Sequence, residues 1–155
     1  MWQQNPGNGH WYTWLEGPIN WFDADATATS LGGYLATITD SQENDWLADT
    51  FNFGDGWIGL VQQPGSVEPD GGWGWVTGEP YVYTNWGPGN PSNADSQGPE
   101  DYGIFDDAGL WHDKRGARDQ SLGGAPWGAI VEMVPEPTTL VLLGSCAPGL
   151  LIRRR

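Results

Sequence analysis

The chain has 155 residues, enough for one domain with a single core. It contains 11 Trp and 24 Gly but only 17% charged residues, a mixture typical of short strands and turns packed by large aromatic rings. Its 20 acidic and 6 basic residues give a formal net charge of −14, and three of the basic residues are Arg153, Arg154 and Arg155. Such an acidic surface repels phosphate backbones, which argues against nucleic acid as a partner.

The two ends of the chain and its one cysteine bear on export and on cross-links. Cys146 is the single cysteine, so no disulfide can form within the chain and packing alone must stabilise the core. Residues 1–6 are polar and lack the basic and apolar regions of a secretory signal. We expect either an export route that does not use such a signal or a natural N-terminus that is missing from this sequence.

Two segments in the first third predict helices. The first begins with Asn20 as its N-cap and has Asp23 three residues later. Its core-facing positions, by helical spacing, are predicted to be Trp21, Ala24, Ala28 and Leu31. The second begins at Asp40 with Glu43 as a capping-box partner. Its predicted core-facing positions are Trp46, Leu47, Thr50 and Phe51.

After residue 54 the helical pattern stops and short β-rich runs follow, separated by Gly and Pro. The predicted strands are 57–60, 72–76, 81–86, 101–105, 110–112 and 127–133. Between them, residues 87–99 are rich in Gly, Pro, Asn and Ser and are too many for a hairpin turn. A loop of that length in a compact domain is usually functional. The order predicts an α+β fold with a candidate binding site in this loop.

The residues along 9–133 resemble the C-type lectin-like domain in the right order. The first half of that resemblance is carried by WFDA at 21–24, LGGYLATI at 31–38 and SQEN at 41–44. The middle is carried by WIGL at 57–60, WGW at 73–75 and TNW at 84–86. The end is carried by EDY at 100–102, LWHD at 110–113 and AIVE at 129–132.

The resemblance implies a C-type lectin-like fold over residues 1–133, with two helices packed on short antiparallel β-sheets and a long loop region. The four cysteines usual in that family correspond to Ala28, Tyr102, a position near Gly116, and Val131. This member is therefore expected to be disulfide-free. Each bridge contributes about 2–4 kcal/mol, which the abundant tryptophans would have to offset.

The resemblance also implies a candidate calcium site in the long loop. Sugar-binding members use a Glu-Pro-Asn or Gln-Pro-Asp triplet with a cis proline, a later Glu, and an Asn-Asp pair after a Trp. The corresponding candidate ligands here are Asn90, Ser92, Glu100, His112 and Asp113, with Pro91 predicted cis and Asn93 or Asp95 as further oxygen donors.

Three of the five family side chains are changed at this candidate site. Ca²⁺ takes six to eight oxygens, several of them from carboxylates, and does not favour a histidine nitrogen. His112 is therefore interpreted either as a degenerate ligand or, preferably, as a hydrogen-bonding residue on a strand edge. A second calcium site is weaker still, because Gln62 and Ser66 stand where acids would be needed.

The C-terminal segment 134–155 resembles the PEP-CTERM sorting signal of Gram-negative bacteria, which exosortase reads. Its parts are Pro135, Glu136 and Pro137, an apolar run over 138–152, and the terminal arginines 153–155. The apolar run is shorter than the roughly 20 residues of a membrane span, so we expect a transient anchor. The resemblance implies export through an inner-membrane intermediate, followed by cleavage near the Pro-Glu-Pro and a place at the cell surface or in the extracellular matrix. An ordinary short membrane anchor is the alternative.

Two binding functions remain as hypotheses, and an enzyme is disfavoured. The first is carbohydrate recognition, for example of exopolysaccharide, through the loop at 87–99 and with calcium as a candidate cofactor. The second is a calcium-independent module for a protein or matrix partner, which the altered triplet favours. No nucleophile elbow, zinc-protease helix or phosphate-binding glycine loop is present in the sequence.

Overall fold

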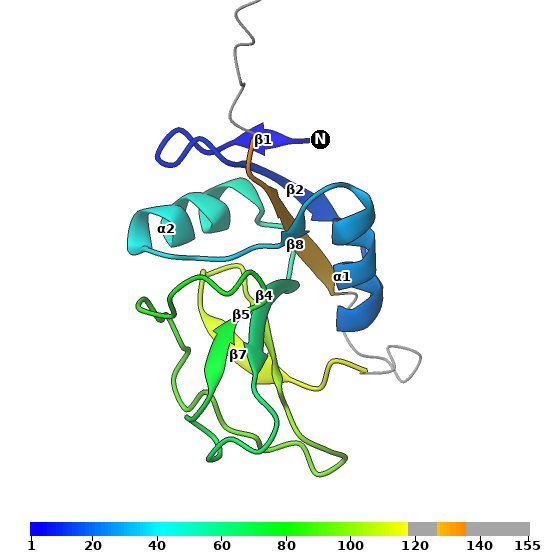
Figure 1. The fold of residues 1–155 in the computed structure, drawn as a ribbon, viewed down its shortest axis with the longest axis vertical. Coiled ribbons are helices and arrows are strands. Elements are labelled where there is room, and N and C mark those ends of the chain that lie inside the picture. Colours follow the sequence, from blue (N-terminus) through cyan, green and yellow to red (C-terminus); the bar gives the residue numbers. More distant parts are fainter. Residues whose placement is uncertain (118–126, 136–155) are drawn as a thin grey trace, which may run out of the picture.

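The computed structural model describes residues 1–117 and 127–135. Two helices and eight strands lie within these ranges (Figure 1). The helices are α1 (Trp21–Ser30) and α2 (Ser41–Thr50). The strands are β1 (Gln3–Gln4), β2 (Trp11–Leu15), β3 (Tyr34–Leu35), β4 (Gly56–Gln62), β5 (Trp73–Trp75), β6 (Tyr102–Phe105), β7 (Trp111–Lys114) and β8 (Gly128–Met133).

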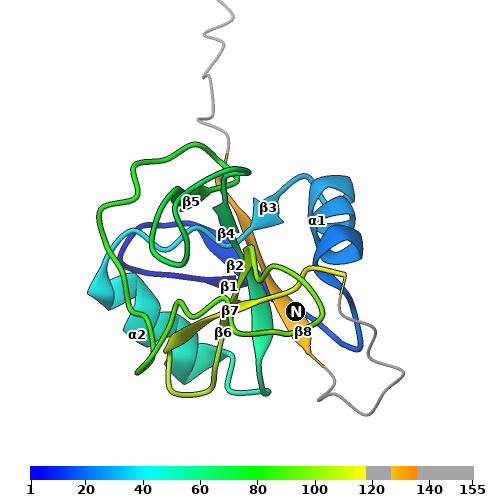
Figure 2. The same ribbon diagram turned by 90° about the horizontal axis from the view of Figure 1, so that it is seen from below.

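The strands form one mixed sheet in the order β1-β2-β8-β4-β6-β7, with β3 added beside β8 and β5 beside β4. The last strand pairs with an early one, since Trp11 faces Met133 in an antiparallel register. The pair β4 and β8 is parallel, with Trp57 opposite Ala129, while the other pairs are antiparallel. The two helices lie on either side of the central strands (Figure 2). The predicted fold class is confirmed, although the sheet is mixed and not wholly antiparallel.

Both helices begin where the capping residues predict. The side chain of Asn20 accepts a hydrogen bond from the backbone N–H of Asp23, and that of Asp40 accepts one from the N–H of Glu43. The inward position predicted for Leu31 is wrong, because α1 ends at Ser30 and Leu31, at its C-cap, is 44% exposed. Gly32 follows with a φ of +81°, which turns the chain away from the helix.

The strand predicted at 81–86 is wrong. This segment is irregular, and its one ladder contact is an isolated bridge between Trp86 and Trp111. Its aromatic side chains pack inward although backbone pairing is confined to that bridge. The Tyr83 and Trp86 ring centroids lie 5.6 and 6.0 Å from that of Trp111. Conversely, the sequence did not predict β2, whose burial does not alternate along the strand and so gives no period-2 signal.

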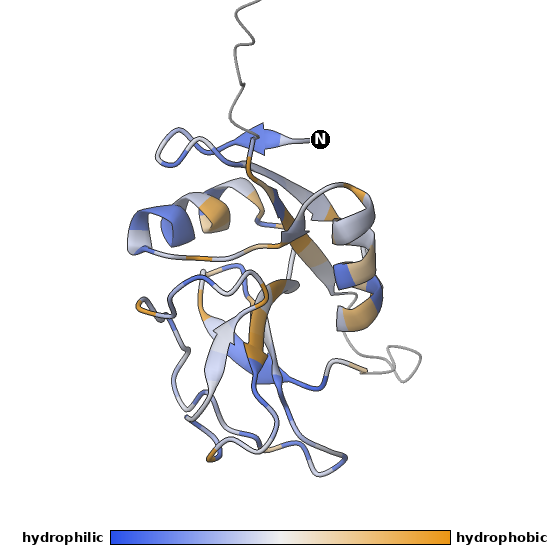
Figure 3. Cartoon of the chain, in the orientation of Figure 1, coloured by the Kyte–Doolittle hydropathy of each residue, from blue (hydrophilic) through white to orange (hydrophobic). Residues whose placement is uncertain are grey.

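The core consists of two clusters of buried side chains. One includes Tyr12, Leu47 and Trp111, and the other includes Trp21, Trp57 and Val131. All eleven tryptophans are buried or half-buried. Apolar residues gather on the central strands, whereas the outer turns of α2 are hydrophilic (Figure 3). Within residues 1–117 and 127–135, no helix is both long and apolar enough for a membrane span.

Packing occupies the positions that correspond to cysteines in the resemblance. Ala28 and Val131 are fully buried in the same cluster. Gly116 lies against the ring of Tyr102, because a Cβ at Gly116 would come within 2.6 Å of that ring. Aromatic and aliphatic contacts therefore stand at these positions in place of cross-links.

Candidate functional site

Two buried carboxylates lie beneath the loop at 87–99. Glu100, at the end of that loop, is 4% exposed, and Asp113, on β7, is 0% exposed. The antiparallel register of β6 and β7 places Asp113 opposite Gly103, three residues after Glu100. The sheet therefore brings together the two acids that the sequence analysis singled out.

The loop wraps its own backbone around these two acids. Asp113 accepts hydrogen bonds from the N–H groups of Ser92 and Asn93, while Glu100 accepts them from Ala94 and Asp95. The hydroxyl of Ser92 lies between the carboxylates, 3.4 Å from Asp113 Oδ1 and 3.5 Å from Glu100 Oε2. Four successive amides thus hold the inner side of the loop to two side chains.

Asn90 and His112 do not join that group. Asn90 Nδ2 lies 3.1 Å from His112 Nδ1, and His112 Nε2 lies 3.0 Å from Asp106 Oδ2. The Asn90–Pro91 peptide bond is cis, as predicted. The structure therefore splits the five candidate ligands: Ser92, Glu100 and Asp113 converge, whereas Asn90 and His112 bond each other.

The two further oxygen donors proposed from the loop have other partners. Asn93 Oδ1 accepts a hydrogen bond from the backbone N–H of Glu100 at 3.0 Å. Asp95 accepts one from Arg115 Nε at 2.8 Å. In addition, the ammonium of Lys114 lies 3.4 Å from Glu100 Oε1. Lys114 was not among the predicted site residues, although it directly follows Asp113.

These residues do not fit a calcium ion. Ca²⁺ needs six to eight oxygen ligands, yet the acids at its expected place accept backbone N–H groups and one faces an ammonium. Across residues 1–117 and 127–135, no group of three or more His, Cys, Asp or Glu side chains is arranged to hold a metal ion. The second candidate calcium site does not fit the ion either. Gln62 donates to the carbonyls of Pro69 and Gly71, and Ser66 donates to that of Gln63.

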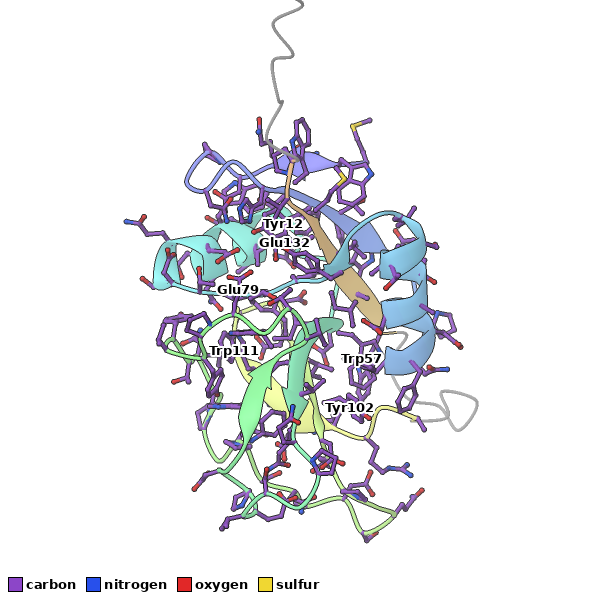
Figure 4. The ribbon with its side chains drawn as sticks, in the orientation of Figure 1. Tyr12, Trp57, Glu79, Tyr102, Trp111 and Glu132 are labelled. Carbon is purple, nitrogen blue, oxygen red and sulfur yellow. The ribbon has the colours of Figure 1, made fainter. Side chains whose placement is uncertain are left out.

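A second pair of buried acids, which the sequence analysis missed, joins the N-terminal hairpin to α2 and β8. Glu43 accepts hydrogen bonds from the Tyr12 hydroxyl, from Asn8 Nδ2 at 3.1 Å, and from the N–H and hydroxyl of Thr39. Glu132 accepts one from the N–H of Thr37 at 2.9 Å and pairs with His10 Nδ1 at 2.6 Å. Tyr12 and Glu132 lie next to each other at this end of the domain (Figure 4).

Burial governs the titration of this network. Desolvation raises the pKa of Glu132 to about 7, opposed by the hydrogen bonds from Thr37 and His10. Desolvation and the negative charge of Glu132 and Glu43 also raise the pKa of the Tyr12 hydroxyl. In the sequence, Glu43 was identified only as a capping-box residue. Its side chain instead accepts hydrogen bonds from Thr39 and Tyr12 and so links α2 to the core.

Comparison with known proteins identifies the family. A family model for the lectin C-type domain matches residues 17–118, and the chain therefore belongs to this family. A perlucin-like protein of Mytilus galloprovincialis is 38% identical over 93 residues, which cover 56% of this chain and 54% of that protein. The low affinity immunoglobulin epsilon Fc receptor of Mus musculus is 34% identical over 102 residues, or 66% of this chain and 29% of the receptor. The matches thus span only part of these relatives' lengths.

The fold agrees with solved structures of the family. The carbohydrate-recognition domain of cow CD23, solved in the presence of a GlcNAc2Man3 oligosaccharide, superimposes with a TM-score of 0.67 at 26% identity. The superposition covers 81% of this chain and 88% of the CD23 domain. These similar proteins are lectins or binding receptors and not enzymes, and at the level of the family they support carbohydrate recognition.

Proposed function

We propose that this chain is a carbohydrate-binding module that recognises neutral glycans through the loop at 87–99 without calcium. The observation that carries the proposal is that Glu100 and Asp113 hold this loop through four backbone amides. Ser96 and Gln97, on the outer side of the loop, stay exposed. A loop fixed from within loses little conformational entropy when its outer polar groups bind a sugar.

The charges of the domain favour a neutral glycan. The chain carries −14 overall, which repels uronic acids and sulfated sugars. Lys114 and Arg115, the basic residues near the loop, already face Glu100 and Asp95. Little positive charge is left there to attract an anionic polysaccharide.

Binding of the full chain to an array of neutral and acidic glycans, in calcium and in EDTA, tests the proposal. We expect retention on neutral glycans that is the same in both buffers. Loss of retention in EDTA would contradict the calcium-independent part. An array that stays silent would overturn glycan binding and favour the alternative of a protein or matrix partner.

Two matched variants test whether the glycan binds at the loop 87–99. Gln97→Ala removes an exposed amide from the loop, together with the hydrogen bond that its oxygen accepts from Arg115, and Gln63→Ala removes an exposed amide from another loop. Removal of one hydrogen bond to a ligand costs about 1 kcal/mol, or roughly fivefold in affinity. We expect that loss for Gln97→Ala alone, and equal effects of the two variants would place the glycan elsewhere.

We also propose that the module is exported and then processed at its C-terminal segment by exosortase. The support is the sequence: Pro135 follows β8, whereas Glu136, Pro137 and Arg153–Arg155 lie outside the described residues. Expression in a Gram-negative host with and without exosortase tests this, with fractionation and mass spectrometry of the product. A product of the same mass in both hosts would overturn it.

A further inference from the structure

A cavity of about 200 Å³ lies at the end of the domain that carries the N-terminal hairpin. Its walls come from the N-terminus and β1, from β2 and the residue after it, and from the last residue of α2 and the residues that follow, through Met1, Gln3, Trp14, Glu16, Thr50, Phe51 and Phe53. In Figure 1 the hairpin lies at the top of the molecule, whereas the loop at 87–99 lies at the bottom. The cavity is therefore distinct from the proposed glycan site and shares no lining residue with it.

Three aromatic rings line this cavity at steep angles to one another. The centroids of Trp14 and Phe53 lie 5.7 Å apart with an interplanar angle of 59°, and those of Phe51 and Phe53 lie 6.4 Å apart at 58°. Phe51 is buried, but Phe53 is 62% exposed. Phe53 therefore presents its ring to solvent at the edge of the cavity, beside the rings of Trp14 and Phe51.

The Trp14 ring is fixed in place by two glycines. Gly56 and Gly128 are opposite each other on β4 and β8, and the ring lies over this pair. A Cβ at either position would come within 2.5 or 2.2 Å of the ring, so no larger residue leaves room for it. The ring is thus preorganised, which lowers the entropic cost of binding a ligand against it.

The charged groups of the cavity lining are the carboxylate of Glu16 and the N-terminal amine of Met1, which is the first residue of the chain. The C-terminal end of α2 adds the negative pole of the helix dipole and has no basic residue in its last turn. Among the described residues, the lysine and arginine side chains are Lys114 and Arg115, and both face carboxylates at the glycan loop. His10, in the hairpin at this end, pairs with Glu132 and does not line the cavity.

We propose that this cavity binds a quaternary ammonium group, as in a small ligand that carries a trimethylammonium head. Trimethylammonium is recognised by aromatic faces through cation–π attraction, with Trp the strongest ring, and by nearby negative charge. Tilted rings contact several methyl groups of such a head at once. A neutral sugar would use the rings but not the charge of Glu16.

Titration of the full chain with choline tests this, followed through the NMR signals of the Trp14 indole. We expect saturable shifts with a dissociation constant on the order of 1 mM, as for a ligand with few heavy atoms. The neutral tert-butyl isostere of choline has the same shape without the charge. It should bind at least about fivefold more weakly if cation–π attraction and charge contribute.

Matched variants locate the site. Phe53→Ala should weaken choline binding by about fivefold, whereas Phe22→Ala removes a similarly exposed ring from α1 and should leave the affinity unchanged. Glu16→Gln should weaken it about threefold, whereas Glu68→Gln, at an exposed site elsewhere, should not.

Three results would overturn the proposal: no saturation by choline, equal affinity for the neutral isostere, or equal effects of Phe53→Ala and Phe22→Ala. Shifts at Trp14 with methyl glucoside in place of choline would also contradict it. A peptide with a trimethyl-lysine shares the head group, and tighter binding of that peptide than of choline would identify a methylated chain as the source. Because glycan retention is measured at the opposite end of the domain, failure of either proposal leaves the other open to its own result.

Discussion

The two ends of this domain each bury a pair of acids, but the partners of the two pairs differ. At one end Glu132 bonds to His10, 122 residues away, and Glu43 bonds to Asn8 and Tyr12, 35 and 31 residues away, as well as to its neighbour Thr39. At the other end Glu100 and Asp113 bond to the loop that lies between 5 and 21 residues before them. The first pair joins the N-terminal hairpin, α2 and β8, whereas the second gives one loop its shape.

A buried acid in this fold therefore stabilises either the whole domain or one loop, depending on which segments donate hydrogen bonds to it. Loss of the first pair should affect unfolding of the whole domain. Loss of the second pair should affect the loop and its ligand more than the global free energy of unfolding. Four predictions test this difference.

The largest effect is expected for Glu43→Ala. The change leaves four donors without their acceptor, from Asn8, Tyr12 and Thr39, most of them buried or half-buried. We expect the free energy of unfolding in urea to fall by about 4 kcal/mol. Glu43→Gln, which keeps one acceptor oxygen, is the control and should lose less. A fall below about 1 kcal/mol for the alanine variant would contradict the prediction.

Glu132 should make stability depend on pH. Its pKa is raised to about 7 in the folded state. Between pH 4.5 and 7, the folded protein therefore keeps a proton on Glu132 that the unfolded chain has released. Stability is therefore expected to fall as the pH rises from about 4.5 to 7, by at most about 3 kcal/mol. Urea unfolding of the wild type and of Glu132→Gln at several pH values measures this.

The glutamine variant provides the control for that pH profile. Other groups around Glu132, namely His10, Glu43, Tyr12 and Tyr34, remain in it, so the part of the slope that disappears belongs to Glu132. An unchanged slope in Glu132→Gln would assign the pH dependence to those neighbours.

Asp113→Ala should act on the loop. Ser92 and Asn93 lose the acceptor of their backbone N–H groups, and we expect a global loss of about 1–2 kcal/mol. The clearer readout is hydrogen exchange, in which these two amides should lose protection while those of β4 keep theirs. Glycan retention should fall in parallel. Uniform loss of protection across the sheet would remove the distinction between the two acid pairs.

The smallest effect is expected for Lys114→Met. The ammonium is partly exposed and lies 3.4 Å from Glu100, so its contribution to the free energy of unfolding should stay below about 1 kcal/mol. Equilibrium unfolding at low and high salt measures it. A calcium-dependent rise in the melting temperature of this variant would show that Lys114 occupies the place of a cation.

Much of the fold could be predicted from sequence because its signals are local. The N-caps at Asn20 and Asp40 depend on hydrogen bonds within one turn, and both helices begin there. Leu31, the residue after α1, was wrongly predicted to face the core, because helical spacing alone does not show where a helix ends. The segment at 81–86 was predicted as a strand because aromatic content favours strands, whereas here the rings pack into the core and backbone pairing is limited to the bridge at Trp86.

The candidate site was predictable only in part. The order of motifs that resembles the family predicted that Glu100, Asp113 and the loop with Pro91 lie in one region. It could not show that Ser92 to Asp95 turn their amides onto the acids, or that Lys114 and Arg115 face them. Those facts depend on the path of the loop and on the register of β6 against β7.

The sequence by itself thus determined the family, the two helices and the absence of an internal disulfide, because these follow from local patterns and from residue identity. Only the tertiary structure determined which groups the buried carboxylates contact. His10 reaches Glu132 because β8 returns beside β2, and Trp14 forms one wall of a cavity because Gly56 and Gly128 pair beneath it. Interactions between residues so far apart in the chain depend on strand register, which no local pattern encodes.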